Sequence, residues 1–526
     1  MKPRGGQRLL RQVQSVLEQR CPETRLLCSQ TPGSRGFASA IPQEAFDEPP
    51  QNHKEGKVLH PDLLNENFRN AEYAVRGELY LKGQELVKAG RDIIFTNVGN
   101  PQQLGQKPLT FNRQVQALVS APYLIDHPQA KGLFPADAVA RAKTMLKYFP
   151  GGVGAYSDSR GSAGVRQEVA DNITRRDGYP ASPDNVFLTD GASVAVRYML
   201  NAIIRDNRDG IMVPIPQYPL YSASIQLYGG RLLGYQLDED AGWGMGIPEL
   251  RRTVRDARAN GLAARAIVFI NPGNPTGQCL SYDNLRELIK FAHEEKLVLM
   301  ADEVYQENIY QDKLPFVSAR KVMMDLGEPY SKEVELCSFH TVSKGSLGEC
   351  GLRGGYVETT NLHPGTIEEI YKIASINLSP NIMGQVAMSL MVNPPKEGDE
   401  SYPQYKEERA STIASLRRRA HTMTDAFNAC EGITCNFTEG AMYSFPRLHL
   451  PQKAIEAARQ AGKPADTFYC LELLEETGIL TVPGTGFGQR EGSFHLRTTI
   501  LPPEDQMPVL VDRFQTFHKK FMDKYR

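Results

Sequence analysis

The chain has 526 residues, of which 41% are hydrophobic and 23% are charged, and its 60 basic residues nearly balance its 61 acidic residues. This composition is typical of a globular protein, and the net charge of −1 gives no sign of the excess of basic residues that marks nucleic acid binding. No apolar run approaches the roughly 18 residues that cross a bilayer, which excludes a transmembrane helix.

The first 40 residues carry seven basic residues against two acidic ones. Leucine and valine recur at helical spacing between Leu9 and Leu17, with arginines between them. A basic amphipathic helix poor in acidic residues is typical of an organellar transit peptide, so we expect residues 1–45 to be a cleaved targeting segment. Because arginine outweighs serine, the mitochondrial matrix is favoured over the chloroplast. A disordered basic tail without a targeting role is the alternative interpretation.

The next segments predict an arm that leads into the folded protein. Residues 41–60 are rich in Pro, Gln, Glu and His and predict a linker. A helix is predicted from Leu63 to Val87 and a strand from Asp92 to Val98, followed by a turn at Gly99. We assign residues 46–115 to an N-terminal arm and to part of a small domain.

The middle of the chain alternates short β-rich runs with amphipathic helices, such as the one predicted from Asn284 to Glu294. Five runs bounded by turn residues are predicted as strands: Asn185–Leu188, Gly210–Val213, Arg265–Ile270, Leu297–Ala301 and Val334–Phe339. This alternation predicts an α/β fold in which residues 116–392 form a large three-layer α/β/α domain around a mostly parallel sheet. In such sheets, ligands bind beyond the carboxyl ends of the strands.

The C-terminal part predicts a second, smaller domain. Residues 393–408 are polar and proline-bearing, so we expect a boundary or an exposed loop there. A long helix is predicted from Lys406 to Asn428, and strands and helices follow it. Residues 393–526 are therefore assigned to a C-terminal part that completes the smaller α+β domain.

The eight cysteines are scattered along the chain without a CxxC pair. We expect reduced and mostly buried thiols, because neither a disulfide framework nor a zinc site has this spacing. The sequence predicts no metal site.

Several chemically distinct side chains follow predicted strands, where the fold places ligands. They are Asn274 in a proline-glycine loop, Asp302 and Tyr305 after one strand, and Lys344 and Arg353 after another. An amide, a carboxylate, a phenol, an amine and a guanidinium together suit pyridoxal 5′-phosphate, because its Schiff-base lysine needs a carboxylate that pairs with the pyridinium nitrogen. A structural ion pair with an arginine is the competing interpretation of Asp302, and a simple turn residue that of Asn274.

The residues that could bind the phosphate of this cofactor are less strongly indicated by the sequence. Gly191-Ala192-Ser193 precedes a predicted helix from Val194 to Ile204, whose free N–H groups are suited to a phosphate, although serine is also a common helix cap. The hydroxyl of Thr341 and the forked guanidinium of Arg353 also suit a phosphate.

Two more residues are candidates for contacts with the ring and the substrate. Tyr218 follows a strand and could stack on a cofactor ring, although an aromatic residue beside prolines more often serves packing. Arg497 lies in an apparent strand near the C-terminus, where its guanidinium could bind a substrate carboxylate through two hydrogen bonds.

Five long strings of residues point to one family. They are Phe187-Leu-Thr-Asp-Gly-Ala-Ser, Pro214-Ile-Pro-Gln-Tyr-Pro-Leu-Tyr-Ser-Ala-Ser, Ile270-Asn-Pro-Gly-Asn-Pro-Thr-Gly-Gln, Ala301-Asp-Glu-Val-Tyr-Gln-Glu-Asn and Ser343-Lys-Gly-Ser-Leu-Gly-Glu-Cys-Gly-Leu-Arg-Gly-Gly-Tyr. From about Asn97 to Arg526 the chain resembles the fold-type I pyridoxal phosphate aminotransferases, and within them the alanine aminotransferases most. The resemblance implies ping-pong transamination, in which L-alanine and 2-oxoglutarate give pyruvate and L-glutamate.

The resemblance also implies a role for each candidate on the cofactor. Lys344 is the Schiff-base lysine and the proton shuttle, and Asp302 binds the pyridine nitrogen. Asn274 and Tyr305 bind the phenolic oxygen, and Tyr218 stacks on the ring. The residues expected to bind the phosphate are Ala192, Ser193, Thr341 and Arg353.

For the substrate, the resemblance implies that Arg497 holds the α-carboxylate, with Gly99 beside it. Tyr156 matches a tyrosine that reaches the phosphate of a neighbouring subunit in this family. The expected assembly is therefore a homodimer with shared sites.

Three alternatives stay open at this point. A glutamate–glyoxylate aminotransferase has the same chemistry, but those of plants are peroxisomal, and this chain ends in Asp523-Lys-Tyr-Arg without a serine-lysine-leucine signal. A pyridoxal phosphate lyase shares the fold but not the long strings. A non-catalytic binding module is disfavoured by the intact Lys344.

Overall fold

The computed structural model describes residues 52–73 and 77–526. Contacts divide the chain into two units, of which the second, Asn65–Arg526, holds every strand assigned below. The predicted targeting segment, residues 1–45, lies outside the described residues. Among the described residues, no helix combines the length and the apolar character of a membrane span, and the six cysteines are free thiols.

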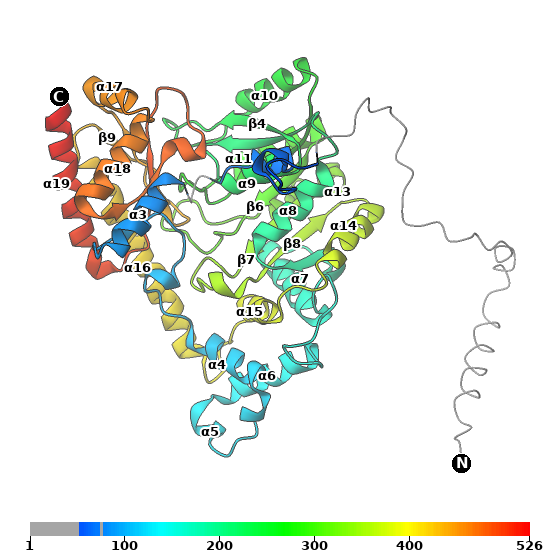
Figure 1. Ribbon diagram of the computed structural model, residues 1–526. Coiled ribbons are helices and arrows are strands. Elements are labelled where there is room, and N and C mark those ends of the chain that lie inside the picture. The colour runs from blue at the N-terminus through cyan, green and yellow to red at the C-terminus, as the bar shows by residue number, and fades with distance from the viewer. Residues whose placement is uncertain (1–51, 74–76) are drawn as a thin grey trace, which may run out of the picture. The chain divides into compact units, whose positions relative to one another are not determined.

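A seven-stranded sheet forms the centre of the second unit (Figure 1). Its strands are β2 (Val186–Thr189), β3 (Asp209–Ile215), β4 (Arg231–Gln236), β5 (Ala263–Ile270), β6 (Val298–Asp302), β7 (Leu336–Thr341) and β8 (Gly355–Thr360). Their order across the sheet is β2-β8-β7-β6-β5-β3-β4. Within this sheet β8 alone runs in the direction opposite to the other six strands. The prediction of a mostly parallel sheet is confirmed.

Helices cover both faces of this sheet. On one face lie α8 (Ala192–Ile203), α9 (Pro219–Leu227) and α14 (Pro364–Ile376), and on the other lie α10 (Ile247–Ala259), α11 (Tyr282–Glu295) and α12 (Ala319–Asp325). Successive strand residues point to opposite faces, so Val213 is buried with the first set of helices and Met212 with the second. The predicted three-layer α/β/α architecture is therefore confirmed.

A further group of helices packs beside β2 and β8. Its members are α4 (Thr110–Ser120), α6 (Ala136–Tyr148), α7 (Ala163–Asp177) and α15 (Ile382–Val392), and the short α5 (Ala130–Leu133) lies between α4 and α6 in the chain. The four members bury a third apolar cluster together with Val186 and Leu188 of β2. The expected limits of the large domain lie inside α4, after residue 115, and at the end of α15, and they stay predictions.

The smaller region joins the N-terminal segment to the C-terminal part of the chain. Its strands are β1 (Ile94–Phe95), β9 (Ile433–Thr434), β10 (Tyr443–Ser444), β11 (Arg447–Leu448), β12 (Ile479–Leu480), β13 (Val482–Pro483) and β14 (Leu496–Thr499). Its helices are α3 (Glu78–Lys88), α16 (Tyr402–Asn428), α17 (Gln452–Gln460), α18 (Ala465–Thr477) and α19 (Met507–Tyr525). β1 pairs in parallel with β12, and α3, blue in Figure 1, contacts the orange α18. This is the smaller α+β part that we expected.

Three sequence predictions need correction. The helix predicted from Leu63 to Val87 is wrong: Asn65 caps a new helix, α2 (Glu66–Arg69), and α3 begins separately after Gly77. The strand predicted from Asp92 to Val98 is reduced to the two residues of β1.

The third correction concerns the loop predicted at residues 393–408. α16 already begins at Tyr402, with Pro403 in its first turn. A proline is accommodated there because the first N–H groups of a helix have no partner within the helix. Two strands were not predicted from the sequence. They are β4, whose apolar sequence pattern is interrupted by Gly234, and the antiparallel β8.

The remaining elements are short. They are α13 (Tyr330–Glu333) and the 3-10 turns η1 (Pro61–Leu63), η3 (Gln102–Leu104), η4 (Pro122–Leu124), η5 (Pro183–Asn185), η6 (Cys350–Leu352), η7 (Gly484–Phe487) and η8 (Glu504–Gln506).

Candidate active site

The carboxyl ends of β6 and β7 bring the central candidates together. Asp302 is the last residue of β6, and Thr341 is the last residue of β7, three residues before Lys344. β6 and β7 are neighbours and run in parallel, so both ends open at the same edge of the sheet. Arg497 comes from β14 of the smaller region and reaches the same place.

Asp302 presents an oxygen that has no partner in the protein. Its Oδ2 accepts a hydrogen bond from Oη of Tyr221 at 2.7 Å, whereas the buried Oδ1 has no partner among the described residues. Burial raises the pKa of this carboxyl to about 6, against the opposing effects of the Tyr221 hydroxyl, the Val304 N–H and Lys344. The arginine ion pair offered as the competing interpretation is wrong, because no arginine of the described residues pairs with Asp302. A buried acceptor of this kind fits a cationic N–H donor.

Lys344 lies in a loop that holds its amine beside Gly99 and Tyr305. Its Nζ donates a hydrogen bond to the carbonyl oxygen of Gly99 at 2.9 Å and lies 5.6 Å from the centroid of the Tyr305 ring. The loop is anchored where the N–H of Gly345 donates to Oδ1 of Asn308 at 2.9 Å. The amine therefore faces the space that Asp302 and Tyr305 border.

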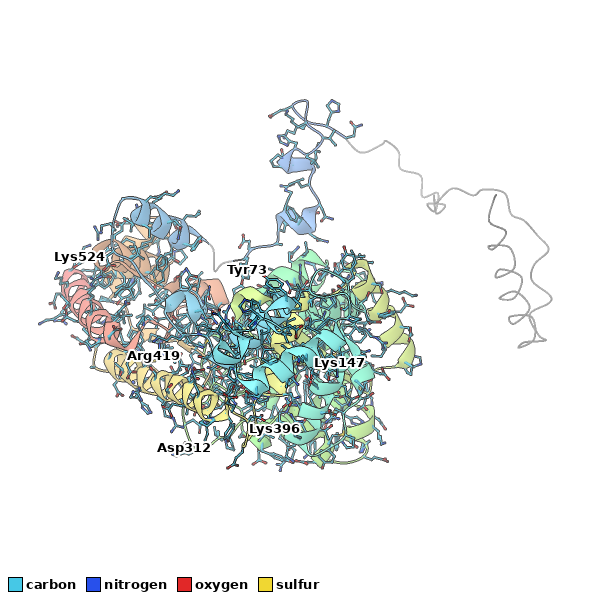
Figure 2. All side chains as sticks on the ribbon, turned by 90° about the horizontal axis from the view of Figure 1, so that it is seen from below. Tyr73, Lys147, Asp312, Lys396, Arg419 and Lys524 are labelled. Atoms are coloured by element: carbon cyan, nitrogen blue, oxygen red, sulfur yellow. The ribbon has the colours of Figure 1, made fainter. Side chains whose placement is uncertain are left out.

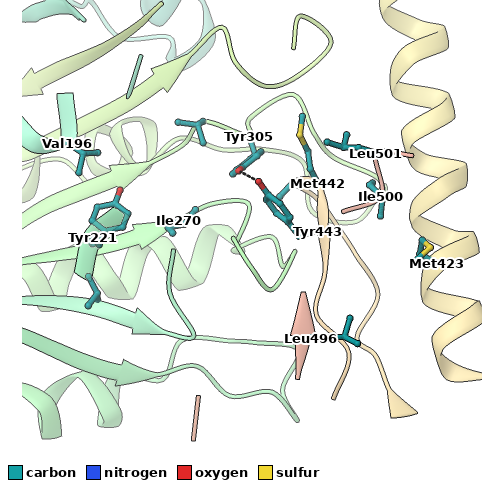
Figure 3. Close-up of a cluster of buried hydrophobic side chains, with 14 of the residues drawn as sticks. Val196, Tyr221, Ile270, Tyr305, Met423, Met442, Tyr443, Leu496, Ile500 and Leu501 are labelled. Carbon is teal, nitrogen blue, oxygen red and sulfur yellow. Dashed lines mark hydrogen bonds between the residues drawn. The ribbon is translucent and has the colours of Figure 1, made fainter. Parts of the chain in front are cut away.

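Two tyrosine hydroxyls meet in this space. Oη of Tyr305 donates to Oη of Tyr443 at 3.1 Å, and both side chains are buried (Figure 3). Burial raises the pKa of Tyr305. Burial also acts to raise the pKa of Tyr443, but the positive charges of Lys344 and Arg497 hold it below its usual value.

Arg497 is packed between two aromatic rings. Its guanidinium carbon lies 4.4 Å from the ring centroid of Tyr443 and 4.8 Å from that of Phe487. Nη2 donates to the carbonyl oxygen of Asn97 at 2.6 Å, and Nη1 donates to Oδ1 of Asn274 at 3.3 Å. Nε is buried and has no partner among the described residues, which leaves this cation a free donor for an anionic ligand.

The predicted phosphate contacts meet where α8 begins. Nη2 of Arg353 donates to the carbonyl oxygen of Asp190 at 2.9 Å and to Oγ of Ser193 at 3.3 Å. Gly191 precedes Ala192, the first residue of α8, with a φ of 83°, and a Cβ at this position would overlap the Arg353 guanidinium. Glycine therefore allows the arginine to approach the helix start, whose N–H groups favour an anion.

Thr341 also reaches this end of the site, but its hydroxyl is engaged by the protein. Its Oγ1 donates to the carbonyl oxygen of Gly354 at 2.8 Å, lies 3.1 Å from Oγ of Ser343 and accepts from the Ser343 N–H at 3.3 Å.

Tyr218 and Tyr156 lie in different surroundings. Tyr218 directly precedes α9, and its Oη lies 2.8 Å from Oη of Tyr73, which Figure 2 labels. Burial raises the pKa of Tyr218. Tyr156 lies between α6 and α7, and 77% of its surface is exposed.

Sequence reasoning missed three tyrosines of this site. Tyr221 follows Tyr218 by three residues, and that helical spacing is a signal that could have placed both on one side of α9. Tyr443 lies in a strand of only two residues, and Tyr73 in an irregular segment, so neither has a local pattern that would single it out.

The comparisons with known proteins agree on one family. The family model for aminotransferase class I and II matches residues 126–514. The chain belongs to this family. It is 63% identical over 469 residues to glutamate–glyoxylate aminotransferase 1 of Arabidopsis thaliana, which covers 89% of this chain and 98% of that protein. It is 48% identical over 516 residues to the mitochondrial alanine aminotransferase 2 of the same plant, covering 96% and 94%.

The fold comparison gives the same result for this aminotransferase. An alanine aminotransferase from Pyrococcus furiosus superposes with a TM-score of 0.70 at 25% identity, over 87% of this chain and all of that chain. The protein is therefore a transferase that depends on pyridoxal 5′-phosphate. The donor set fits this cofactor, because the partnerless Oδ1 of Asp302 suits the pyridine nitrogen, the amine of Lys344 suits the aldehyde, and Arg353 at the start of α8 suits the phosphate.

Proposed function

We propose that the protein is an alanine aminotransferase, which converts L-alanine and 2-oxoglutarate reversibly into pyruvate and L-glutamate by a ping-pong reaction. The alanine aminotransferases among the relatives support the choice of substrate, and one observation carries the transamination chemistry. An amine, a partnerless buried carboxylate oxygen and a guanidinium, from Lys344, Asp302 and Arg497, border the same space. This combination binds an α-amino acid by its carboxylate and moves a proton at its Cα.

Each side chain has a defined task in this proposal. Bound pyridoxal 5′-phosphate withdraws electrons from the substrate Cα and carries the amino group between the two half-reactions. The carboxylate of Asp302 accepts a hydrogen bond from the pyridine nitrogen and keeps it protonated, because burial makes an unpaired charge there unfavourable. Asn274 and Tyr305 donate to the phenolic oxygen, and Tyr218 stacks on the ring. The phosphate contacts are Ala192, Ser193, Thr341 and Arg353, and the Thr341 hydroxyl would turn from the Gly354 carbonyl oxygen to donate to the phosphate.

The substrate is held and deprotonated by three residues. Arg497 binds the α-carboxylate, and its position between the rings of Tyr443 and Phe487 keeps the guanidinium in one orientation. Gly99 leaves room beside it, since a Cβ there would overlap Oη of Tyr443 and lie 3.2 Å from Nζ of Lys344. Nζ of Lys344 then removes the Cα proton of the substrate and returns a proton when the product is released.

A glutamate–glyoxylate aminotransferase is the second candidate, and the 63% identity to the Arabidopsis enzyme of that name favours it. We expect kcat/KM to be higher for the pair L-alanine and 2-oxoglutarate than for L-glutamate and glyoxylate. Single-turnover spectra with each amino acid would separate donor from acceptor preference. Failure of L-alanine to change the absorbance of the bound cofactor, while L-glutamate does so, would reject the alanine assignment.

We also propose a homodimer with shared sites, in which Tyr156 of one subunit reaches the phosphate of the other. An exposed apolar patch supports this assembly. Tyr156, Ile376 and Leu378 expose 77%, 80% and 54% of their surfaces. Oγ of Ser159 donates to the carbonyl oxygen of Leu378 at 2.6 Å, which joins the loop that carries Tyr156 to the end of α14, where Ile376 and Leu378 lie. Exposed apolar patches of this kind mark protein interfaces.

Co-expression of two differently tagged variants tests the shared site. A heterodimer of K344A and Y156A subunits has one site with both Lys344 and Tyr156 intact. We expect the activity per Lys344 to return to that of the parent enzyme in the purified heterodimer. Activity that stays at the level of the Y156A homodimer contradicts the sharing of sites.

Targeting to the mitochondrial matrix by residues 1–45 is a further part of the proposal. The basic, acid-poor N-terminal composition and the mitochondrial name of an Arabidopsis relative support it. A fluorescent protein fused behind residues 1–45 should enter mitochondria, and the same fusion with Arg4, Arg8 and Arg11 replaced by glutamate should not. Equal distribution of the two fusions contradicts the proposal.

A further inference from the structure

The hydrogen bond between Tyr305 and Tyr443 has a consequence for the bound cofactor. A phenol has one proton, and Tyr305 gives its proton to Oη of Tyr443 at 3.1 Å (Figure 3). In the proposed function Tyr305 gives that same proton to the phenolic oxygen of the cofactor. Tyr305 cannot make both bonds as a donor, so the bond between the two tyrosines persists in the loaded enzyme only if Tyr443 becomes its donor.

The surroundings of Tyr443 hold its hydroxyl beside the hydroxyl of Tyr305. The two rings meet edge to face at 6.0 Å and 86°, and both are buried. The hydroxyl lies against Gly99, where a Cβ would overlap it, and the Arg497 guanidinium packs on its ring at 4.4 Å. Pairing of Tyr443 with Thr499, in the strand that carries Arg497, fixes the backbone. The hydroxyl therefore stays within reach of Tyr305.

We propose that Tyr443 is a positioning residue that donates a hydrogen bond to Oη of Tyr305 in the cofactor-loaded enzyme and thereby strengthens the bond from Tyr305 to the phenolic oxygen. The inference rests on the proposed role of Tyr305. Hydrogen bonds in a chain polarise one another, so a phenol that accepts one bond donates a stronger one. Tyr443 comes from the smaller region. The two consecutive hydrogen bonds, from Tyr443 to Tyr305 and from Tyr305 to the phenolic oxygen, therefore link that region to the electronic state of the cofactor.

Two properties of the surroundings make Tyr443 a good donor. The nearby charges of Lys344 and Arg497 hold the pKa of its hydroxyl below the usual value in spite of burial, and a more acidic phenol is a stronger donor. Burial excludes water, which would otherwise compete for the oxygen of Tyr305.

The test is the pH midpoint of the absorbance change of the bound cofactor, measured for the parent enzyme, Y305F, Y443F and the double variant. A donor to the phenolic oxygen stabilises its anionic form, so weakening that donor raises the midpoint. We expect a rise on the order of 1 pH unit for Y305F, and of about 0.3 for Y443F, since neighbouring bonds strengthen one another by roughly 10–30%. In the Y305F background, Y443F should cause no further rise.

A matched control removes another buried tyrosine hydroxyl. In Y469F the lost bond is to Nδ1 of His518 at 2.9 Å in the smaller region, and the midpoint should stay at the parental value. Thermal melting of each loaded variant reports folding independently of the spectrum. The Y443F variant keeps the ring under Arg497, so its KM for L-alanine should stay within about 2-fold of the parental value.

The outcomes separate the two hypotheses. A midpoint that rises in Y305F but not in Y443F overturns the role of Tyr443 and leaves that of Tyr305. An equal rise from Y443F in the parental and the Y305F backgrounds also overturns it, because the effect would not pass through Tyr305. An unchanged midpoint in Y305F overturns both this inference and the proposed role of Tyr305.

Discussion

The seven-stranded sheet and the three-stranded sheet β10–β14–β13 contribute to one site by different means. Asp302 and Thr341 end strands of five and six residues that have partner strands on both sides. Tyr443 comes from a strand of two residues, and Arg497, on β14, is also held by the side chains of Tyr443, Phe487 and Asn274 and by the Asn97 carbonyl oxygen. Backbone register thus places the residues of the large sheet, whereas those of the small sheet depend on side-chain contacts in addition to their short backbone pairing.

This difference predicts how substitutions act. On the large sheet, a substitution that keeps the shape should remove one chemical function and leave the geometry intact. On the small sheet, a substitution that removes one of the packed rings or the guanidinium should disturb neighbouring residues and change substrate binding. The following experiments are ordered from the largest expected effect to the smallest.

The largest effect is expected for Asp302→Asn. The amide keeps the shape but loses the negative charge that pairs with the pyridine nitrogen, so kcat should fall by roughly 10³-fold. Steady-state kinetics with L-alanine and 2-oxoglutarate measure it. Asp302→Glu keeps the charge and serves as the control. A kcat for Asp302→Asn within a few-fold of the parental value would show that the partnerless Oδ1 has no role in the reaction.

The same carboxyl should give the cofactor-free protein a pH-dependent stability. Its pKa is about 6 in the folded state against 3.8 ordinarily, so the folded state holds the proton more tightly. The resulting stabilisation is complete below about pH 4 and is lost as the pH rises through about 6. Relative to Asp302→Asn, the free energy of unfolding should fall by about 3 kcal/mol over this window. Urea unfolding of both proteins measures it, and parallel curves would contradict the prediction.

Arg497→Leu tests the small sheet. Loss of the guanidinium removes the donor for the α-carboxylate and leaves Asn274 and the Asn97 carbonyl without their partner. We expect KM to rise by about 100-fold for both L-alanine and 2-oxoglutarate. Arg418→Leu, which removes an exposed arginine of α16 paired with Glu504, is the matched control and should change KM little. Equal effects of the two substitutions would reject the assignment of Arg497.

The smallest effect is expected for Tyr221→Phe. The variant removes the 2.7 Å hydrogen bond to Oδ2 of Asp302 but keeps the ring on α9. A bond to a charged group is worth about 1.5 kcal/mol, so kcat should fall by roughly 10-fold while KM stays similar. In the Asp302→Asn background, Tyr221→Phe should lower kcat by a smaller factor than it does in the parent enzyme. Additive losses would mean that Tyr221 does not act through Asp302.

The same contrast explains how much of the site the sequence could predict. Asp302, Lys344 and Arg353 follow buried β-rich runs, and that local pattern is enough to place them at one edge of a parallel sheet. Most of the large sheet was predicted for the same reason. The two strands that were not predicted are β4, whose apolar sequence pattern is interrupted by Gly234, and β8, which is antiparallel to β2 and β7.

The small sheet could not be predicted in this way. β10 and its partner β14 are two and four residues long and lie more than fifty positions apart in the chain. No periodic pattern fits into two residues, so only the three-dimensional fold reveals that Tyr443 belongs to the site. Arg497 was a candidate from its place in an apparent strand, and the family resemblance supported its role, but neither predicted its stacking between Tyr443 and Phe487.

The account depends most on the covalent attachment of the cofactor to Lys344. Reduction of the loaded enzyme with borohydride fixes the bond between the lysine and the cofactor aldehyde, and peptide mass spectrometry then locates it. We expect the added mass of the reduced cofactor on the peptide that contains Lys344, and none on any peptide of the K344A variant. The same mass on another lysine, or L-alanine turnover by K344A at the parental rate, would contradict the account.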